Sequence, residues 1–342
     1  MSEKRYLVLA EGHSDDPHHG KTARGVLRYR NDAVVAVLDS RRAGETVEGL
    51  PIVASVEDAL RYGPTTALVG VATSGGRFPP AWRELLKSCI AAGLDIENGL
   101  HEFISEDDEL SELAARGSVE LRDLRKPPAG LNVPTGRNLE LHAKVVLTVG
   151  SDCAIGKMTV SLELDREARR RGIASVFVPT GQTGIAIGGW GISVDAVVSD
   201  FLAGAAEELV VEGAARGGEL LWVEGQGSLL HPMYSGVTLG LIHGSAPHAY
   251  VLCHEARQRY VDDDPRFPIP PLAELAELHE RMSLLARPAR VAAIALNTRA
   301  LSEEEARAEV QEVADSTGIP VEDPVRFGSA RLLDAVLRTL KN

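Results

Sequence analysis

The chain has 342 residues, of which 44% are hydrophobic and 25% are charged, a composition typical of a soluble globular protein long enough for two domains. The formal net charge of −13 and the aromatic content of 4% disfavour a nucleic-acid partner, because such partners require basic surfaces and stacking side chains. Apolar runs of strand length predict no membrane segment, the N-terminus predicts a cytoplasmic protein, and three widely spaced cysteines disfavour a disulfide framework.

The first 124 residues alternate short apolar runs with helical patterns, which predicts a Rossmann-like α/β domain with a mainly parallel sheet. Strands are expected at residues 6–10, 34–38, 67–71, 94–97 and 119–121, and helices ending at Tyr29 and at 55–62, 79–92, 100–103 and 110–115. Asp39 follows the second strand, where an acidic side chain can bind a ribose hydroxyl, although no GxGxxG motif follows the first strand.

Between the first strand and the first helix lies the polar segment EGHSDDPHHG. His13, His18 and His19 are residue types that ligate metal ions, and Asp15 and Asp16 stand among them. Such a cluster is more often a solvated loop than a metal site. We expect no resident metal ion in this protein.

A segment rich in proline and glycine, residues 125–143, is predicted to link the two domains. Residues 144–342 are then expected to form a P-loop domain that carries the main site. Further strands are predicted at 145–149, 174–178, 220–223, 249–254, 290–296 and 320–321, and helices after Lys157 and at 302–317 and 328–340.

The sequence VVLTVGSDCAIGKMT is the strongest motif of the chain. An apolar strand leads into a loop bounded by Gly150 and Gly156, and Lys157 then opens a helical pattern. This layout is typical of a phosphate-binding P-loop, since loop and first-turn N–H groups lack helical partners and can bind an anion. The candidate cofactor-binding residues are Gly150, Ser151, Asp152, Cys153, Ala154, Ile155, Gly156, Lys157, Met158 and Thr159, with Asn297 from a later strand.

Two departures from the common P-loop pattern bear on its chemistry. Five residues separate the glycines instead of four, and Met158 follows Lys157 where a Ser or Thr hydroxyl normally holds Mg²⁺. Thr159 lies roughly 100° further round the helix and is poorly placed for that duty. The loop is therefore predicted to hold a pyrophosphate, and less clearly to hydrolyse one. Cys153 is either a nucleophile or a small packing residue.

Other candidates follow strands of the same domain. Glu224 ends an apolar strand in WVEGQGS, where it can act as a general base, with Asp200 and His231 as further catalytic candidates. Backbone N–H groups near Gly181 or Gly225 are expected to stabilise an oxyanion. The candidate substrate-binding residues are Gly181, Gln182, Thr183, Gly225, Arg257 and Arg259.

The motifs GSDCAIGKMT, FVPTGQTG, WVEGQGS and ALNT occur in the order seen in dethiobiotin synthetase and MinD-like P-loop proteins. The whole layout resembles a two-domain family, long without an assigned function, that joins a Rossmann-like domain to a P-loop domain and includes D-glutamate N-acetyltransferases. The loop differs from the family's by Ser151, where Thr is common.

This resemblance implies an N-acetyltransferase that moves acetyl from acetyl-CoA to the amino group of an acidic D-amino acid such as D-glutamate, with the P-loop holding the CoA pyrophosphate. The expected partner is this small-molecule substrate, and a homo-oligomer is expected. Two alternatives remain: a Mg-ATP-dependent ligase or kinase-type enzyme resembling dethiobiotin synthetase, and a non-catalytic nucleotide sensor.

Overall fold

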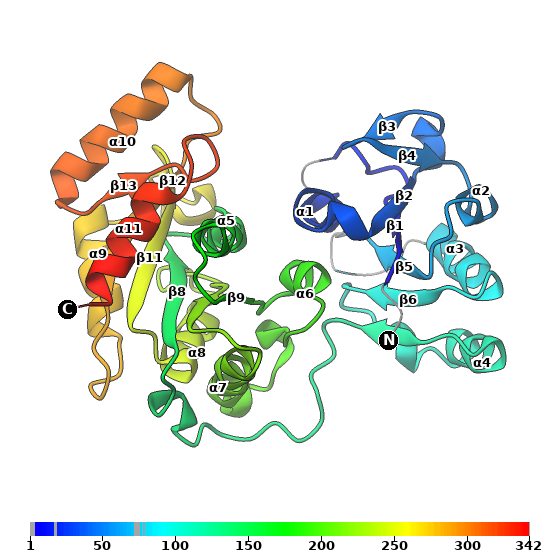
Figure 1. The fold of residues 1–342 in the computed structure, drawn as a ribbon, viewed down its shortest axis with the longest axis horizontal. Coiled ribbons are helices and arrows are strands. Elements are labelled where there is room, and N and C mark those ends of the chain that lie inside the picture. The colour runs from blue at the N-terminus through cyan, green and yellow to red at the C-terminus, as the bar shows by residue number, and fades with distance from the viewer. Residues whose placement is uncertain (1–3, 17–18, 72–75, 77, 79, 342) are drawn as a thin grey trace. The chain divides into compact units, whose positions relative to one another are not determined.

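The computed structural model describes every residue except 1–3, 17–18, 72–75, 77, 79 and 342. The chain forms two compact units, Met1–Pro127 with Gln182–Ser193, and Pro128–Gly181 with Val194–Asn342. Each unit contains its own mainly parallel sheet (Figure 1), which confirms the predicted α/β fold class. The linear division expected from the sequence did not assign residues 182–193 to the first unit. Among the described residues, no helix is both long enough and apolar enough to span a bilayer.

The sheet of the first unit has the strand order β3-β4-β2-β1-β5-β6-β7, and its pairs are parallel except for the β3–β4 pair. The strands are β1 (Tyr6–Leu9), β2 (Val34–Leu38), β3 (Thr46–Val47), β4 (Leu50–Val53), β5 (Thr66–Val69), β6 (Asp95–Asn98) and β7 (Leu121–Asp123). The helices are α1 (Lys21–Tyr29), α2 (Val56–Leu60), α3 (Pro80–Ala91), α4 (Asp108–Gly117) and α6 (Gln182–Gly188).

The prediction of a helix at residues 100–103 was wrong. The chain bends there and then forms a short 3₁₀ turn at Ile104–Glu106. Buried polar side chains replace the helical hydrogen bonds: Asn98 Oδ1 accepts from the N–H of Leu100, and Asp123 Oδ1 accepts from the N–H of Ile104. These local partners satisfy the backbone without a helix.

The sheet of the second unit has the order β13-β12-β11-β8-β10-β9, and each of its pairs is parallel. The strands are β8 (Lys144–Gly150), β9 (Ser175–Val178), β10 (Leu220–Val223), β11 (Ala249–Glu255), β12 (Arg290–Asn297) and β13 (Val321–Glu322). The helices are α5 (Lys157–Arg170), α7 (Ser199–Ala215), α8 (Ser235–Ser245), α9 (Leu272–Arg281), α10 (Glu303–Thr317) and α11 (Ala330–Thr339).

Part of the predicted linker is fixed to the second unit. The carboxylate of Glu207, in α7, is buried and accepts hydrogen bonds from the N–H and hydroxyl of Thr135 and from the N–H of Gly136. Burial opposes the ionisation of Glu207, but these hydrogen bonds together hold its pKa below the ordinary value. The segment after residue 128 therefore packs as part of the domain and is not a free tether.

Candidate functional site

The P-loop lies at the end of β8, the strand flanked by β10 and β11 in the second sheet (Figure 1). The six residues Val145 to Gly150 are buried, and helix α5 begins at Lys157, as the sequence predicted. Because the strands are parallel, the loops after β8, β9, β10 and β11 lie at the same edge of the sheet, where open α/β folds bind ligands.

The loop geometry favours glycine at Gly156 and leaves little room for a side chain at Gly150. A Cβ on Gly150 would lie 2.7 Å from Cδ1 of Ile155, and Gly156 has a φ of +110°, which L side chains rarely adopt. Ala154 also has a positive φ of 54°. The ammonium of Lys157 is buried and donates to the carbonyl of Asp152 at 2.6 Å, so it lies over the loop. No acidic residue occupies the first turn of α5, and the loop is thus suited to an anion.

Two polar side chains of the loop brace it against neighbouring segments. Ser151 Oγ lies 2.8 Å from His254 Nδ1, and burial lowers the pKa of His254 to about 4, so this imidazole is neutral at pH 7. The carboxylate of Asp152 accepts from the N–H of Cys153, from Gln258 Nε2 at 2.6 Å and from the N–H of Asp262 at 2.7 Å. These contacts fix the loop before any ligand binds.

Glu224 connects the ends of β9 and β10. Its side chain is 4% exposed, and Oε2 accepts from the N–H groups of Thr180 at 2.9 Å and Gly181 at 3.2 Å. Gly225 approaches the P-loop strand so closely that a Cβ would lie 1.8 Å from the carbonyl oxygen of Thr148. The predicted residues Glu224, Gly181 and Gly225 therefore share one edge of the sheet with the P-loop.

The two glycine N–H groups expected to bind an oxyanion are already engaged. Gly181 donates to Glu224, and Gly225 donates to Thr148 Oγ1 at 2.9 Å. Both contacts hold the loops together, so the structure assigns these donors to the scaffold. The expectation that backbone N–H groups near Gly181 or Gly225 stabilise an oxyanion stays a prediction, and these two groups would have to leave their present partners to do so.

His231 belongs to the same cluster as the P-loop. One ligating atom each of Asp152, Cys153 and His231 lies within 4.8 Å of the others. His231 Nδ1 accepts from the N–H of Met233 at 3.2 Å, which places the proton of the neutral ring on Nε2. Ser228, which the sequence analysis did not single out, links this segment to the loop by donating to the carbonyl of Ser151 at 3.0 Å.

Other predicted residues of the second unit have different surroundings. Asp200 is exposed in the first turn of α7. Arg257 forms ion pairs with Glu305 at 3.1 Å and Glu309 at 3.3 Å, while the side chain of Arg259 is exposed. A substrate role for either arginine stays a prediction.

The remaining candidates lie at the end of β12 and in the first unit. Asn297 ends β12, and its Nδ2 lies 3.4 Å from Glu255 Oε2. Gln182 and Thr183 open α6, which belongs to the first unit. There Gln182 Oε1 accepts from Arg125 Nη1 at 2.8 Å, and Thr183 Oγ1 lies 2.9 Å from Thr22 Oγ1.

Two family models match the chain: the Rossmann-like domain of unknown function DUF1611_N over residues 40–127, and the P-loop domain of unknown function DUF1611_C over residues 132–333. The chain belongs to the DUF1611 family.

The similarity to known proteins covers almost the full length of the chain. A protein of Tritonibacter scottomollicae named D-glutamate N-acetyltransferase is 36% identical, with 98% of this chain and 99% of the relative aligned. A protein of the same name from Pseudoalteromonas sp. is 34% identical, with 96% and 97% aligned. The crystal structure of a DUF1611 family protein from Anabaena variabilis is 41% identical and matches with a TM-score of 0.90 over 98% of this chain and 99% of that one.

The neutral, buried His254 generates a prediction about pH. Its pKa of about 4 lies below the ordinary 6.5, so between these pH values the imidazole is protonated in the unfolded chain and neutral in the native state. The contribution of neutral His254 to the stability of the native state is complete above pH 6.5 and is lost as the pH falls toward 4. Between pH 7.5 and 5.5 this residue should cost about 1 kcal/mol of the free energy of unfolding.

His254→Asn should remove that part of the pH dependence, measured by urea denaturation at both pH values. His142→Asn is the matched control, because His142 is exposed and should leave the wild-type dependence unchanged. An unaltered pH dependence in His254→Asn would show that His254 is not held neutral.

Proposed function

We propose that the protein is an N-acetyltransferase that moves acetyl from acetyl-CoA to the amino group of an acidic amino acid such as D-glutamate. Its membership of the DUF1611 family and its full-length similarity to two proteins named D-glutamate N-acetyltransferase support this activity. The structural observation that carries the proposal is the loop between Gly150 and Gly156, with Lys157 at the start of α5 and Met158 directly after it.

The P-loop suits coenzyme A as well as a nucleotide. CoA carries an ADP-like pyrophosphate, for which the backbone N–H groups at the start of α5 and the ammonium of Lys157 are suitable donors. Met158 supplies no hydroxyl for Mg²⁺ at the position directly after the lysine. Acyl transfer requires no phosphate cleavage, so the absence of a hydroxyl ligand for Mg²⁺ would not impair it.

The reaction needs one base. A neutral amine attacks the thioester carbonyl, the new C–N bond forms, the C–S bond breaks, and CoA leaves as a thiolate that takes up a proton. Glu224 is the first candidate for removing the amine proton, because it is held by two backbone donors at the sheet edge that carries the P-loop. His231 is the second candidate, since it lies beside Asp152 and Cys153, and the exposed Asp200 is the third.

Two other functions use the same loop. A Mg-ATP-dependent ligase or kinase-type enzyme would release ADP in a metal-dependent reaction. A nucleotide sensor would bind without turnover. The cytoplasmic location and the homo-oligomeric state expected from the sequence remain predictions beside all three.

The first experiment measures which reaction occurs. With D-glutamate and acetyl-CoA, the protein should release free thiol and form N-acetylglutamate at the same rate with and without EDTA, because the proposed step uses no catalytic metal. L-glutamate and glutamine serve as comparison substrates for chirality and charge. ADP formation with Mg-ATP in the absence of thiol release would favour the ligase alternative instead.

Lys157→Ala should weaken CoA binding about 10- to 100-fold, because it removes a charged donor from the pyrophosphate. Isothermal titration calorimetry with CoA measures this. Lys144→Ala is the matched control: Lys144 is exposed at the opposite end of the same strand and should bind CoA as the wild type does. Equal CoA affinity of the two variants would show that the P-loop lysine does not take part in CoA binding.

Glu224→Gln should lower kcat about 10²- to 10⁴-fold, because glutamine cannot accept the amine proton. Its side-chain oxygen still accepts from the N–H groups of Thr180 and Gly181, so the CoA dissociation constant should change little. Glu207→Gln replaces another buried glutamate that accepts backbone N–H groups and should keep the wild-type kcat. Steady-state kinetics of Asp200→Asn and His231→Gln rank the other candidates, and a wild-type kcat in Glu224→Gln would reject Glu224 as the base.

A further inference from the structure

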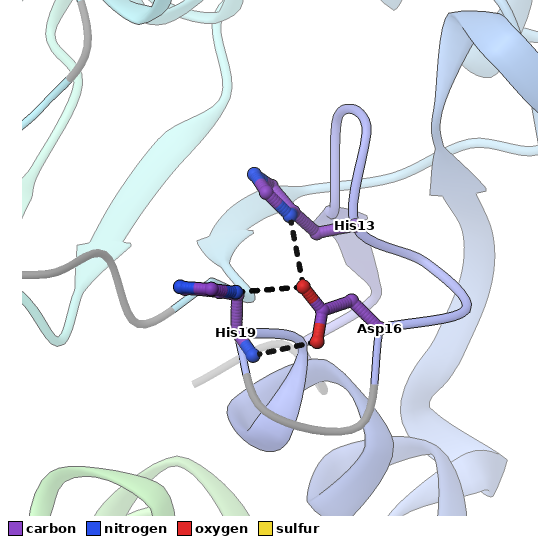
Figure 2. A group of neighbouring side chains, drawn as sticks. All are labelled: His13, Asp16 and His19. Carbon is purple, nitrogen blue, oxygen red and sulfur yellow. Dashed lines mark hydrogen bonds and ion pairs between the residues drawn. The ribbon is translucent and has the colours of Figure 1, made fainter.

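Two histidines converge on one carboxylate in the loop that follows β1 of the first unit. His19 Nδ1 lies 2.7 Å from Asp16 Oδ2, and His13 Nδ1 lies 3.4 Å from the same oxygen (Figure 2). One ligating atom from each of the three residues falls within 4.8 Å of the others. Figure 2 shows both imidazoles directed toward Asp16, each through its Nδ1 nitrogen.

The place of this loop in the fold is that of a ligand site. β1 lies between β2 and β5, and the chain builds the sheet first on the β2 side and then on the β5 side. The loop after β1 therefore lies at the carboxyl end of the strand where the direction of sheet building reverses. Open α/β sheets bind their ligands at this point. The loop has no glycine-rich phosphate fingerprint and carries imidazole and carboxylate groups instead.

The loop is also anchored to the sheet. Asp39, at the end of β2, is 1% exposed, and its carboxylate accepts from the N–H of Gly12 and from the N–H and hydroxyl of Ser14. Burial opposes the ionisation of Asp39, yet these hydrogen bonds together hold its pKa below the ordinary value. The carboxylate suggested for a ribose hydroxyl thus holds the loop that carries His13.

Gly20 closes the loop tightly. A Cβ at this position would lie 2.5 Å from the carbonyl oxygen of His13 and 2.6 Å from that of Asp16. The backbone also turns back on itself, because the N–H of Asp16 donates to the His13 carbonyl and the N–H of Gly20 donates to the Asp16 carbonyl. The backbone hydrogen bonds of the loop therefore help to hold His13, Asp16 and His19 near one another, in addition to the contacts between their side chains.

We propose that His13, Asp16 and His19 form a binding site for a divalent transition-metal ion such as Zn²⁺ or Co²⁺. Tetrahedral zinc sites have ligand–ligand separations of about 3.3 Å, given bonds of about 2.0 Å. The His13–Asp16 separation of 3.4 Å already matches that value, and the His19–Asp16 pair needs to open slightly. Two imidazoles and one carboxylate are ligands that these ions accept.

Three protein ligands leave at least one coordination position open. Structural zinc sites have four protein ligands, whereas sites with three hold a water or a substrate atom in the fourth position. The side chains of His13, Asp16 and His19 are 29–33% exposed, so this position is accessible to a small ligand. The proposed site thus belongs to the class that binds an exchangeable water or anion. It does not depend on the acetyltransferase activity proposed above.

The test titrates the full chain with Zn²⁺ by calorimetry and with Co²⁺ by absorption spectroscopy, after removal of adventitious metal with EDTA. The wild type should bind one equivalent at this site with a dissociation constant of about micromolar or below. Loss of a ligand in His13→Gln, Asp16→Asn or His19→Gln should weaken binding at least about tenfold. The exposed His142→Gln is the matched control and should bind as the wild type does.

The second cluster, Asp152, Cys153 and His231, contains a sulfur ligand. The sulfur allows a metal bound there to be distinguished from a metal bound at the proposed site. Binding at the proposed site should give a Co²⁺ spectrum without a thiolate charge-transfer band and should persist in Cys153→Ser. Zn²⁺ should also raise the Tm of the wild type more than that of His19→Gln, because a metal bound to the native state stabilises it. Undiminished binding in the His13, Asp16 and His19 variants, or no binding by the wild type, would overturn the proposal.

Discussion

The contact between the ends of β8 and β10 is the constraint on which the candidate site depends. Gly225 fits against the carbonyl of Thr148 with no room for a Cβ, and its N–H donates to Thr148 Oγ1. This contact joins the P-loop strand to the strand that carries Glu224. Glu224 in turn holds the backbone of Thr180 and Gly181 at the end of β9. Three loops are thereby fixed around one sheet edge by short polar contacts, which is the preorganisation that binding an anion requires.

The same topological position serves opposite chemistries in the two units. At the end of β8 the chain carries the first-turn N–H groups of α5 and the ammonium of Lys157, which suit an anion. At the end of β1 it carries the imidazole and carboxylate groups of His13, Asp16 and His19, for which we proposed a cation. In both loops a glycine at the closing position, Gly156 or Gly20, adopts a conformation or a close approach that other residues resist. In both proposals the topology sets the position of the site, and the loop residues set the charge of the ligand.

The sequence predicted elements whose signals are local. The P-loop strand, the helix after Lys157 and the Ser302-capped helix α10 all carry their pattern within a few residues. Helix α8 was missed because its sequence, SGVTLGLIHGS, mixes glycines with apolar residues and has no clear polar face. The bracing of Asp152 by Gln258 was also beyond sequence analysis, since 106 residues separate the partners and only the β8–β11 pairing brings them together.

The net negative charge of the chain opposes the binding of anions. At a formal net charge of −13, the overall field repels both coenzyme A and an acidic amino acid. In the proposed function, attraction must therefore come from groups that act at short range, within the roughly 8 Å over which salt leaves a charge effective. Lys157 is 6% exposed, and it is the single lysine or arginine among residues 150–157. Its field is little screened there, so in the proposed complex this ammonium and the α5 amides would attract the pyrophosphate.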